Sequence, residues 1–247
     1  MTSVPETADH VLSMDEMAEQ KIRTRIARIS LGASSTTGDS NVPPLIQIDG
    51  ARGQAAALMA IRCPVRIHVT GPLGDYSLSF CDRCDVRVDG DGGHGLAECL
   101  DGASVRLRGD VGHGAGVGMM GGTLAVYGSA GHRFGAAMLA GELFARGDVG
   151  DDAGVAMRGG TLVVGGNAGH RIGEPLGSGT IFLRGRAASL ADGMVEVPLR
   201  KSDELRLGVL LINASIRGAA KEFRRVIPER LWRLEQSRIT GEVRPNW

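Results

Sequence analysis

The sequence contains few aromatic residues and no excess of charge of either sign. Phe, Trp and Tyr make up 4% of its 247 residues, and 28 basic residues balance 28 acidic ones. A neutral chain lacks the basic field that holds a nucleic-acid backbone, so we do not expect nucleic-acid binding. A net charge near zero also disfavours solubility as a free monomer, which favours burial in a larger complex.

Long hydrophobic runs are missing as well. Residues 1–20 (MTSVPETADHVLSMDEMAEQ) are polar and hold no apolar core of a secretory signal, and no stretch approaches the length of a membrane span. Cysteine is scarce, with four residues, and without export these thiols are expected to stay reduced. These features predict a cytoplasmic protein that does not contact membranes.

Glycine is abundant instead, with 38 residues, and it recurs at a fixed interval. A glycine ends a short apolar stretch every 19 residues, at Gly71, Gly90, Gly109, Gly128, Gly147, Gly166 and Gly185. A second glycine follows three residues later in six of these units, and a third comes four residues after that from Gly116 to Gly173. This spacing is typical of a solenoid, and we expect the glycines to supply positive φ angles in its turns.

The apolar positions between the glycines keep the same phase. Val86 and Val88 begin a series of inward pairs with a two-residue period, which continues to Ile181 and Leu183 and is typical of strands with one buried face. Ten residues after each strand-ending glycine another apolar position recurs, at Cys81, Leu100, Met119, Met138, Met157 and Leu176. Each unit therefore has at least two inward-facing segments.

Units with the same order and phase stack like on like, which makes their strands parallel. Antiparallel hairpins would need turn signals that alternate in kind, and a leucine-rich repeat would show a Leu–Asn signature; the sequence has neither. A unit of 19 residues is too short to bury its own apolar face, and neighbouring units must therefore supply the core. The sequence predicts an all-β protein, a single right-handed parallel β-helix of about seven 19-residue coils with short helical N- and C-terminal extensions.

The two ends differ from the repeat and divide the chain into three parts. Residues 1–45 are interpreted as a helical or extended arm and linker, with helical spacing over 14–29. Residues 46–197 form the β-helix. Residues 198–247 form a helical tail that covers the last coil or docks on a partner. In the tail we expect helices over 203–216, 218–226 and 229–237.

The repeated pattern, as in GDVGHGAGVGMMGGTLAVYGSAGHRFGAAM and GDVGDDAGVAMRGGTLVVGGNAGHRIG, resembles the GXGXG family over about residues 46–197. That family includes the C-terminal domain of the glutamate synthase large subunit, the stand-alone third subunit of glutamate-synthase-like complexes such as N-methylglutamate synthase, and the C subunit of formylmethanofuran dehydrogenase and its formyltransferase/hydrolase relatives. The stretch IFLRGRAASLADGM (181–194) and the tail's EFRR are similar to the glutamate-synthase-like branch. The segment after Arg225 departs from it.

This resemblance implies a non-catalytic subunit of a hetero-oligomer. In the family the β-helix carries no reacting group and stands between a class-II glutamine amidotransferase unit and an FMN-containing synthase unit. The implied partners are therefore an amidotransferase-type and an FMN synthase-type subunit, which would hold FMN and an iron–sulfur cluster. No cofactor or catalytic residue is expected in this chain. The C subunit of a formyltransferase/hydrolase complex is the alternative, and a free-standing metal enzyme is a third hypothesis.

Polar side chains recur at one turn position and form the first candidate site. Four residues after each strand-ending glycine stand Asp75, His94, His113, His132, Asp151 and His170. Stacked coils would align them as a ladder, which could bind a metal or bridge to a partner. A turn that is polar because it faces solvent explains the same residues. We favour this explanation, because metal binding needs ligands that converge.

The cysteines form the second candidate site. Cys81 and Cys84 have the CxxC spacing of zinc and redox sites, and Cys63 and Cys99 lie at nearby phases of adjacent coils. Four thiols on one wall could hold zinc or an iron–sulfur cluster. Core thiols that replace small apolar residues give the same pattern, and we favour this interpretation, so no metal site is predicted.

Two enzyme classes are not expected. Strings similar to G-x-G-x-x-G recur in every coil with no helix after them, whereas a dinucleotide-binding fingerprint occurs once between a strand and a helix. The sequence has no G-x-S-x-G elbow, so a hydrolase of that type is not predicted.

Overall fold

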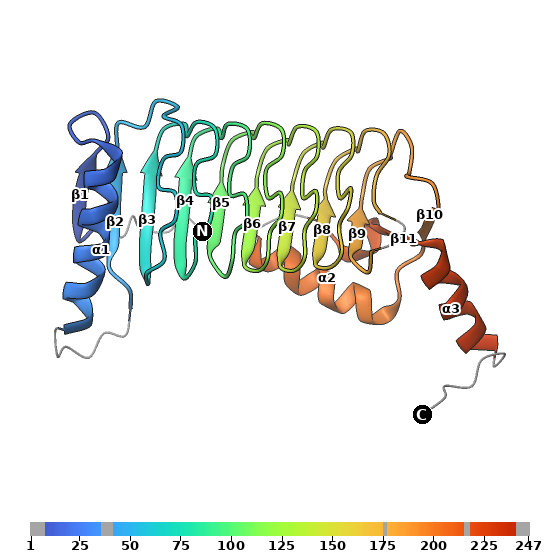
Figure 1. The fold of residues 1–247 in the computed structure, drawn as a ribbon. Helices are drawn as coiled ribbons and strands as arrows, with labels where there is room; N and C mark the ends of the chain where they lie inside the picture. Colours follow the sequence, from blue (N-terminus) through green and yellow to red (C-terminus); the bar gives the residue numbers. More distant parts are fainter. Residues whose placement is uncertain (1–7, 36–41, 175–176, 215–217, 241–247) are drawn as a thin grey trace.

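The chain is a parallel β-solenoid. The computed structural model describes residues 8–35, 42–174, 177–214 and 218–240. Figure 1 shows them as a column of stacked coils, with helix α1 (Glu19–Ser35) at one end and helix α3 (Glu229–Thr240) at the other. About seven coils of about 19 residues make up the column, which confirms the fold class that the glycine spacing predicts.

One strand of each coil joins a single sheet that runs along the column. The described residues contribute 11 strands, and β1 to β9 pair in parallel, each with its neighbour in sequence. These strands are β1 (His10–Ser13), β2 (Leu45–Asp49), β3 (Val65–Thr70), β4 (Cys84–Asp89), β5 (Ser104–Leu107), β6 (Thr123–Val126), β7 (Glu142–Ala145), β8 (Thr161–Val164) and β9 (Thr180–Leu183).

The register of this sheet advances by one coil per strand. Val65 of β3 pairs with Cys84 of β4, and Val86 pairs with Val105 of β5. A second line of parallel bridges lies two residues after each strand-ending glycine, through Leu73, Gly92, Val111, Ala130, Val149, Ala168 and Ala187. Each of these coils is therefore joined to the next along two lines, and like residues stack on like.

The inside of the column is filled by the predicted apolar positions. Val86, Leu107 and Leu124 are fully buried in the strands. The second inward position is buried in every coil where the structure describes it, at Cys81, Leu100, Met119, Met138 and Met157. Leu176, the last residue predicted for this series, lies outside the described residues. One continuous core thus runs through the solenoid.

The strand-ending glycines are required for a different reason from the one predicted. Of this series only Gly71 has a positive φ, 109°. At Gly90 an added Cβ would lie 2.4 Å from the backbone carbonyl of Gly71 in the preceding coil, and at Gly185 it would lie 2.1 Å from that of Gly166. Real Cβ atoms do not approach a carbonyl so closely. These glycines therefore allow one coil to approach the next, and positive φ is a property of the third series, such as Gly116 at 68°.

The outward face of the sheet changes character along the column. Its outward residues are His68, Arg87 and Arg106 on β3 to β5. They are Ala125, Phe144, Val163 and Phe182 on β6 to β9, and all four are buried. Helix α2 (Lys201–Asn213) lies along this second part (Figure 1) and packs Leu207, Leu210 and Leu211 against it. Coverage by α2 explains why the polar alternation of the early strands ends.

The helix predicted over 218–226 is wrong. A short 3₁₀ helix (Ala220–Glu222) is followed by strand β11 (Arg224–Pro228), which pairs antiparallel with both β9 and β10 (Met194–Val197). Val226 and Ile227 are buried in this arrangement. The open edge of β9 offers unpaired backbone groups, and pairing with a β-branched pair of residues outweighs local helix preference. The parallel stack therefore ends with an inserted antiparallel strand.

The N-terminal end differs from the prediction in its boundaries. The helix predicted over 14–29 begins at Glu19 and continues to Ser35, where a linker was expected from residue 30. Strand β1, which was not predicted, precedes it and pairs with β2. Ile22 and Ile26 of α1 are buried against the first coil, so the helix covers this end of the core. No helix among the described residues combines the length and apolar character needed to cross a bilayer.

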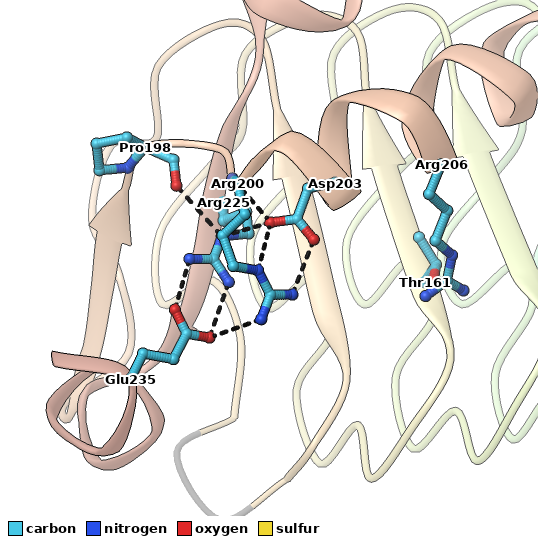
Figure 2. A network of polar contacts seen from close by, with 7 residues as sticks. All are labelled: Thr161, Pro198, Arg200, Asp203, Arg206, Arg225 and Glu235. Atoms are coloured by element: carbon cyan, nitrogen blue, oxygen red, sulfur yellow. Dashed lines mark hydrogen bonds and ion pairs between the residues drawn. The ribbon is translucent and has the colours of Figure 1, made fainter. Parts of the chain in front are cut away.

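A buried arginine joins the C-terminal elements. Arg225 of β11 is 2% exposed and donates hydrogen bonds to both carboxylate oxygens of Glu235 in α3, at 2.8 and 3.0 Å. It also lies 3.1 Å from a carboxylate oxygen of Asp203 in α2. Figure 2 shows that Arg200 faces the same two carboxylates. This network fixes α2, β11 and α3 to one another.

Candidate functional site

The predicted turn ladder is present, and it consists of hydrogen bonds. From Asp75 to Asp151, each member accepts a hydrogen bond from the backbone N–H of the equivalent residue in the next coil. Asp75 Oδ1 accepts from His94 at 2.7 Å, and His94 Nδ1 accepts from His113 at 2.9 Å. The same contact continues through His132, Asp151 and His170. The residues that sequence phase groups together are thus aligned by the fold.

The three central imidazoles are stacked in a fixed tautomer. Ring centroids lie 4.9 Å apart between His94 and His113 and 4.7 Å apart between His113 and His132. Because a backbone N–H donates to each Nδ1, that nitrogen carries no proton, and the proton of the neutral ring is on Nε2. A metal ion would need the lone pair on Nδ1, which the backbone N–H of the next coil already contacts. The arrangement of the ladder therefore suits holding the coils together. At Asp151, the hydrogen bond from the backbone N–H of His170 also lowers the pKa of the carboxyl group.

A second ladder of the same kind was missed by sequence reasoning. Asp110 donates its N–H to Asp91 Oδ1 at 2.9 Å, and Ser129 donates to Asp110 Oδ1 at 2.7 Å. The contact repeats through Asp148 and Asn167. The signal was available, because the residue after the strand-ending glycine is Asp, Ser or Asn in these coils. A short side chain with an oxygen two or three bonds from Cα reaches the backbone of a neighbour one coil away.

The cysteines are placed in two groups. Cys81 and Cys84 are buried and lie in hydrogen-bond contact with each other, and Cys81 Sγ also donates to the carbonyl of Leu58 at 3.2 Å. Cys63 is half-buried and close enough to Cys84 to affect its ionisation. Cys99 is half-buried and lies toward the coil of Gly118. Among the described residues no three His, Cys, Asp or Glu side chains converge as a metal site would require.

The ionisation of the CxxC pair is unequal. The hydrogen bond with Cys81 and burial both raise the pKa of the Cys84 thiol. The same hydrogen bond lowers the pKa of Cys81, although burial opposes it. Burial and the neighbouring Glu98 raise the pKa of Cys99. Cys81 and Cys84 are buried, and buried structural thiols are inert, so these two have the geometry of core residues.

An exposed apolar row on α2 was also missed by sequence reasoning. Leu205, Val209 and Ile212 are 76%, 58% and 77% exposed and follow one another at helical spacing. Gly208 lies within the row, and an added Cβ there would meet no atom within 4 Å. The 3.6-residue period groups the residues of a helix by face. Where two faces are apolar, as in α2, the period does not say which of them packs against the sheet. Contiguous exposed apolar patches mark sites of protein contact, which makes this row a candidate contact site.

The polar surface near the ladders is shallow. A hollow of about 390 Å³ lies beside His94 and His113, between Tyr76 and Arg133.

Comparison with known proteins does not identify the chain, since no protein-family model and no curated protein matches it.

Proposed function

We propose that this chain is a non-catalytic scaffold subunit of a glutamate-synthase-like complex in the cytoplasm. It holds a class-II glutamine amidotransferase-type subunit against an FMN-dependent synthase-type subunit during formation of glutamate or N-methylglutamate. FMN and an iron–sulfur cluster belong to the partner subunits. The proposal starts from the likeness of the glycine repeat to the GXGXG family.

The observation that carries the scaffold role is the in-register stack. Two lines of backbone pairing join neighbouring coils, and between Asp91 and His170 two ladders of side-chain acceptors join them as well. A column joined along four lines resists bending, so surfaces at its two ends stay at a fixed separation. Holding two enzymes at a fixed distance needs this property, whereas a flexible linker does not supply it.

The apolar row on α2 supports a contact with one partner. Leu205, Val209 and Ile212 would be covered in a complex, and Gly208 at the centre of the row would let a partner approach the helix backbone closely. An exposed glycine in a helix interior costs about 1 kcal/mol relative to alanine, so its presence fits a role in contact.

Purification of the tagged chain from its own cells tests the proposal. We expect a stable complex that contains both partner types and shows the absorption bands of FMN. A variant with Leu205→Ser and Ile212→Ser should lose a partner while the solenoid stays folded, because both side chains are exposed. A chain that purifies alone would contradict the proposal, and a zinc amidohydrolase-type partner without flavin would favour the formyltransferase/hydrolase alternative.

A further inference from the structure

A groove runs along the outer side of α1 at the N-terminal end of the column, and we call it the α1 groove. It has a volume of about 950 Å³, and His10 of β1 contributes to its lining. Lys21, Arg25 and Arg28 line it from successive turns of the helix. With a rise of 1.5 Å per residue, these three side chains span roughly 10 Å along the helix axis. They form one basic row.

The three cations are exposed and have no ion pair or hydrogen bond with any residue that the structure describes. Arg23 on the same helix differs, because it contacts Glu19 and the carbonyl of Met59. Like charges one helical turn apart destabilise a helix by a few tenths of a kcal/mol. An uncompensated row of this kind suits an anionic partner.

The floor of the α1 groove is apolar and rigid. Met17 and Ile29 line the groove, are half-buried and pack against the core of the solenoid. On the far side of the helix, Ile22 and Ile26 are buried. The helix is therefore held in place by the first coil, and the groove exists before any partner arrives.

The groove suits carboxylates better than other anions. Duplex DNA carries one charge per about 1.7 Å, which three cations on a neutral chain do not match. No Phe, Tyr or Trp is among the described residues that line the groove, so bases have no ring on which to stack. A membrane-surface helix inserts its own apolar face into lipid, and here that face is buried in the column. Cations beside an apolar floor match acidic and aliphatic side chains on one face of a helix.

We propose that the α1 groove docks an acidic amphipathic helix of a partner protein. Carboxylates at positions i, i+4 and i+7 of that helix pair with Lys21, Arg25 and Arg28, and aliphatic side chains on either side of this row rest on Met17 and on Ile29. The inference deepens the proposed scaffold function by giving the chemistry of one partner contact, and it rests on that function only in requiring a protein partner.

Fluorescence anisotropy with the full chain tests the α1 groove. The probe is a labelled helical peptide with Glu at i, i+4 and i+7 and Leu on the same face, and its control has Lys at the three Glu positions. We expect the acidic peptide alone to bind, and to bind more weakly as salt is added. The variant Lys21→Glu, Arg25→Glu, Arg28→Glu should weaken binding of the acidic peptide at least about tenfold and acquire affinity for the basic one.

A matched variant separates the groove from overall charge. Arg186→Glu, Lys201→Glu and Arg238→Glu make the same change in net charge at the other end of the column and should leave binding unchanged. Equal binding of both peptides, or unchanged binding by the groove variant, would overturn the inference. So would binding of single-stranded RNA or phosphatidylserine vesicles in place of the acidic peptide. None of these outcomes changes the flavin test of the proposed function, because that test reports the composition of the complex.

Discussion

Different side chains occupy the same turn position in successive coils, and what they share is an atom that accepts a hydrogen bond. At a single phase of the repeat, Asp75, His113 and Asp151 each take a hydrogen bond from the backbone one coil ahead. Asp and His differ in charge and size, but both place an acceptor atom two bonds beyond Cβ or nearer. A typical hydrogen bond contributes about 0.5–1.5 kcal/mol to stability. The acceptor, and not the residue type, is what this position requires.

Substitution of His113 tests this requirement. His113→Ala leaves the N–H of His132 without its acceptor and removes two stacked ring contacts, so we expect a loss of about 1 kcal/mol in the free energy of unfolding. His113→Asp should lose much less, because Asp occupies the same phase at two other coils. Urea denaturation followed by circular dichroism measures both. Equal losses for the two variants would show that the acceptor is unimportant.

The strand-ending glycines give a second prediction at this scale. Gly90→Ala places a Cβ 2.4 Å from the backbone of Gly71, which cannot move without shifting a coil, so we expect a loss of about 2–3 kcal/mol. Gly208→Ala is the control, because its Cβ meets no atom within 4 Å and alanine favours helix. The control should be neutral or more stable by up to about 1 kcal/mol in thermal melting. A Gly90→Ala variant as stable as the control would contradict the close approach of coils.

At the scale of elements, the C-terminal region is held by an ion network that spans three segments. Hydrogen bonds from Arg225 hold the pKa of Glu235 below its usual range. Burial raises the pKa of Asp203, but hydrogen bonds from Arg200 outweigh it, so that pKa is also lowered. A carboxyl whose pKa is lowered by folding contributes stability above its unfolded pKa and loses it as pH falls.

This network predicts an acid-sensitive C-terminal end. At pH 7 Glu235→Gln should lower the melting temperature, because Arg225 is left buried with one charged partner fewer. As pH falls below about 4, the wild-type carboxylate takes up a proton, so the difference between wild type and variant should shrink. Thermal melts between pH 7 and pH 3 measure this. A difference that stays constant or grows toward acid pH would contradict the network's role.

The sequence predicts elements well where the repeat operates and poorly where it stops. The strands from β3 to β9 follow from phase alone, because every coil meets an equivalent neighbour. Strand β11 does not, because its partners are the last coil and β10, and nothing in residues 224–228 says that an open edge waits for them. The burial of Arg225 has the same cause, since its carboxylate partners come from α2 and α3.

Sites were predicted less completely than strands. Phase placed the histidine ladder and brought Cys81 near Cys84, because position within a coil fixes both. It did not show that the ladder members accept backbone hydrogen bonds, which depends on side-chain geometry. Nor did it find the α1 groove or the apolar row on α2. Those surfaces depend on which side of a helix packs inward, and that is decided by contacts distant in sequence.

At the scale of the whole molecule, the column carries two surfaces of different chemistry, one basic and one apolar. Helix α1 presents a basic row at one end, and α2 presents an apolar row along the outer face of β6 to β9. The core between them is continuous and joined coil to coil. Distinct surfaces on a stiff body are what the proposed scaffold function requires.

The scaffold account is tested most directly by an activity assay of the chain with and without its partners. Glutamine-dependent formation of glutamate or N-methylglutamate is measured for the purified chain, for the two partner subunits together, and for all three. We expect no turnover by the chain alone and the highest coupled rate when it is added to the partners. Turnover by the purified chain alone would contradict the account.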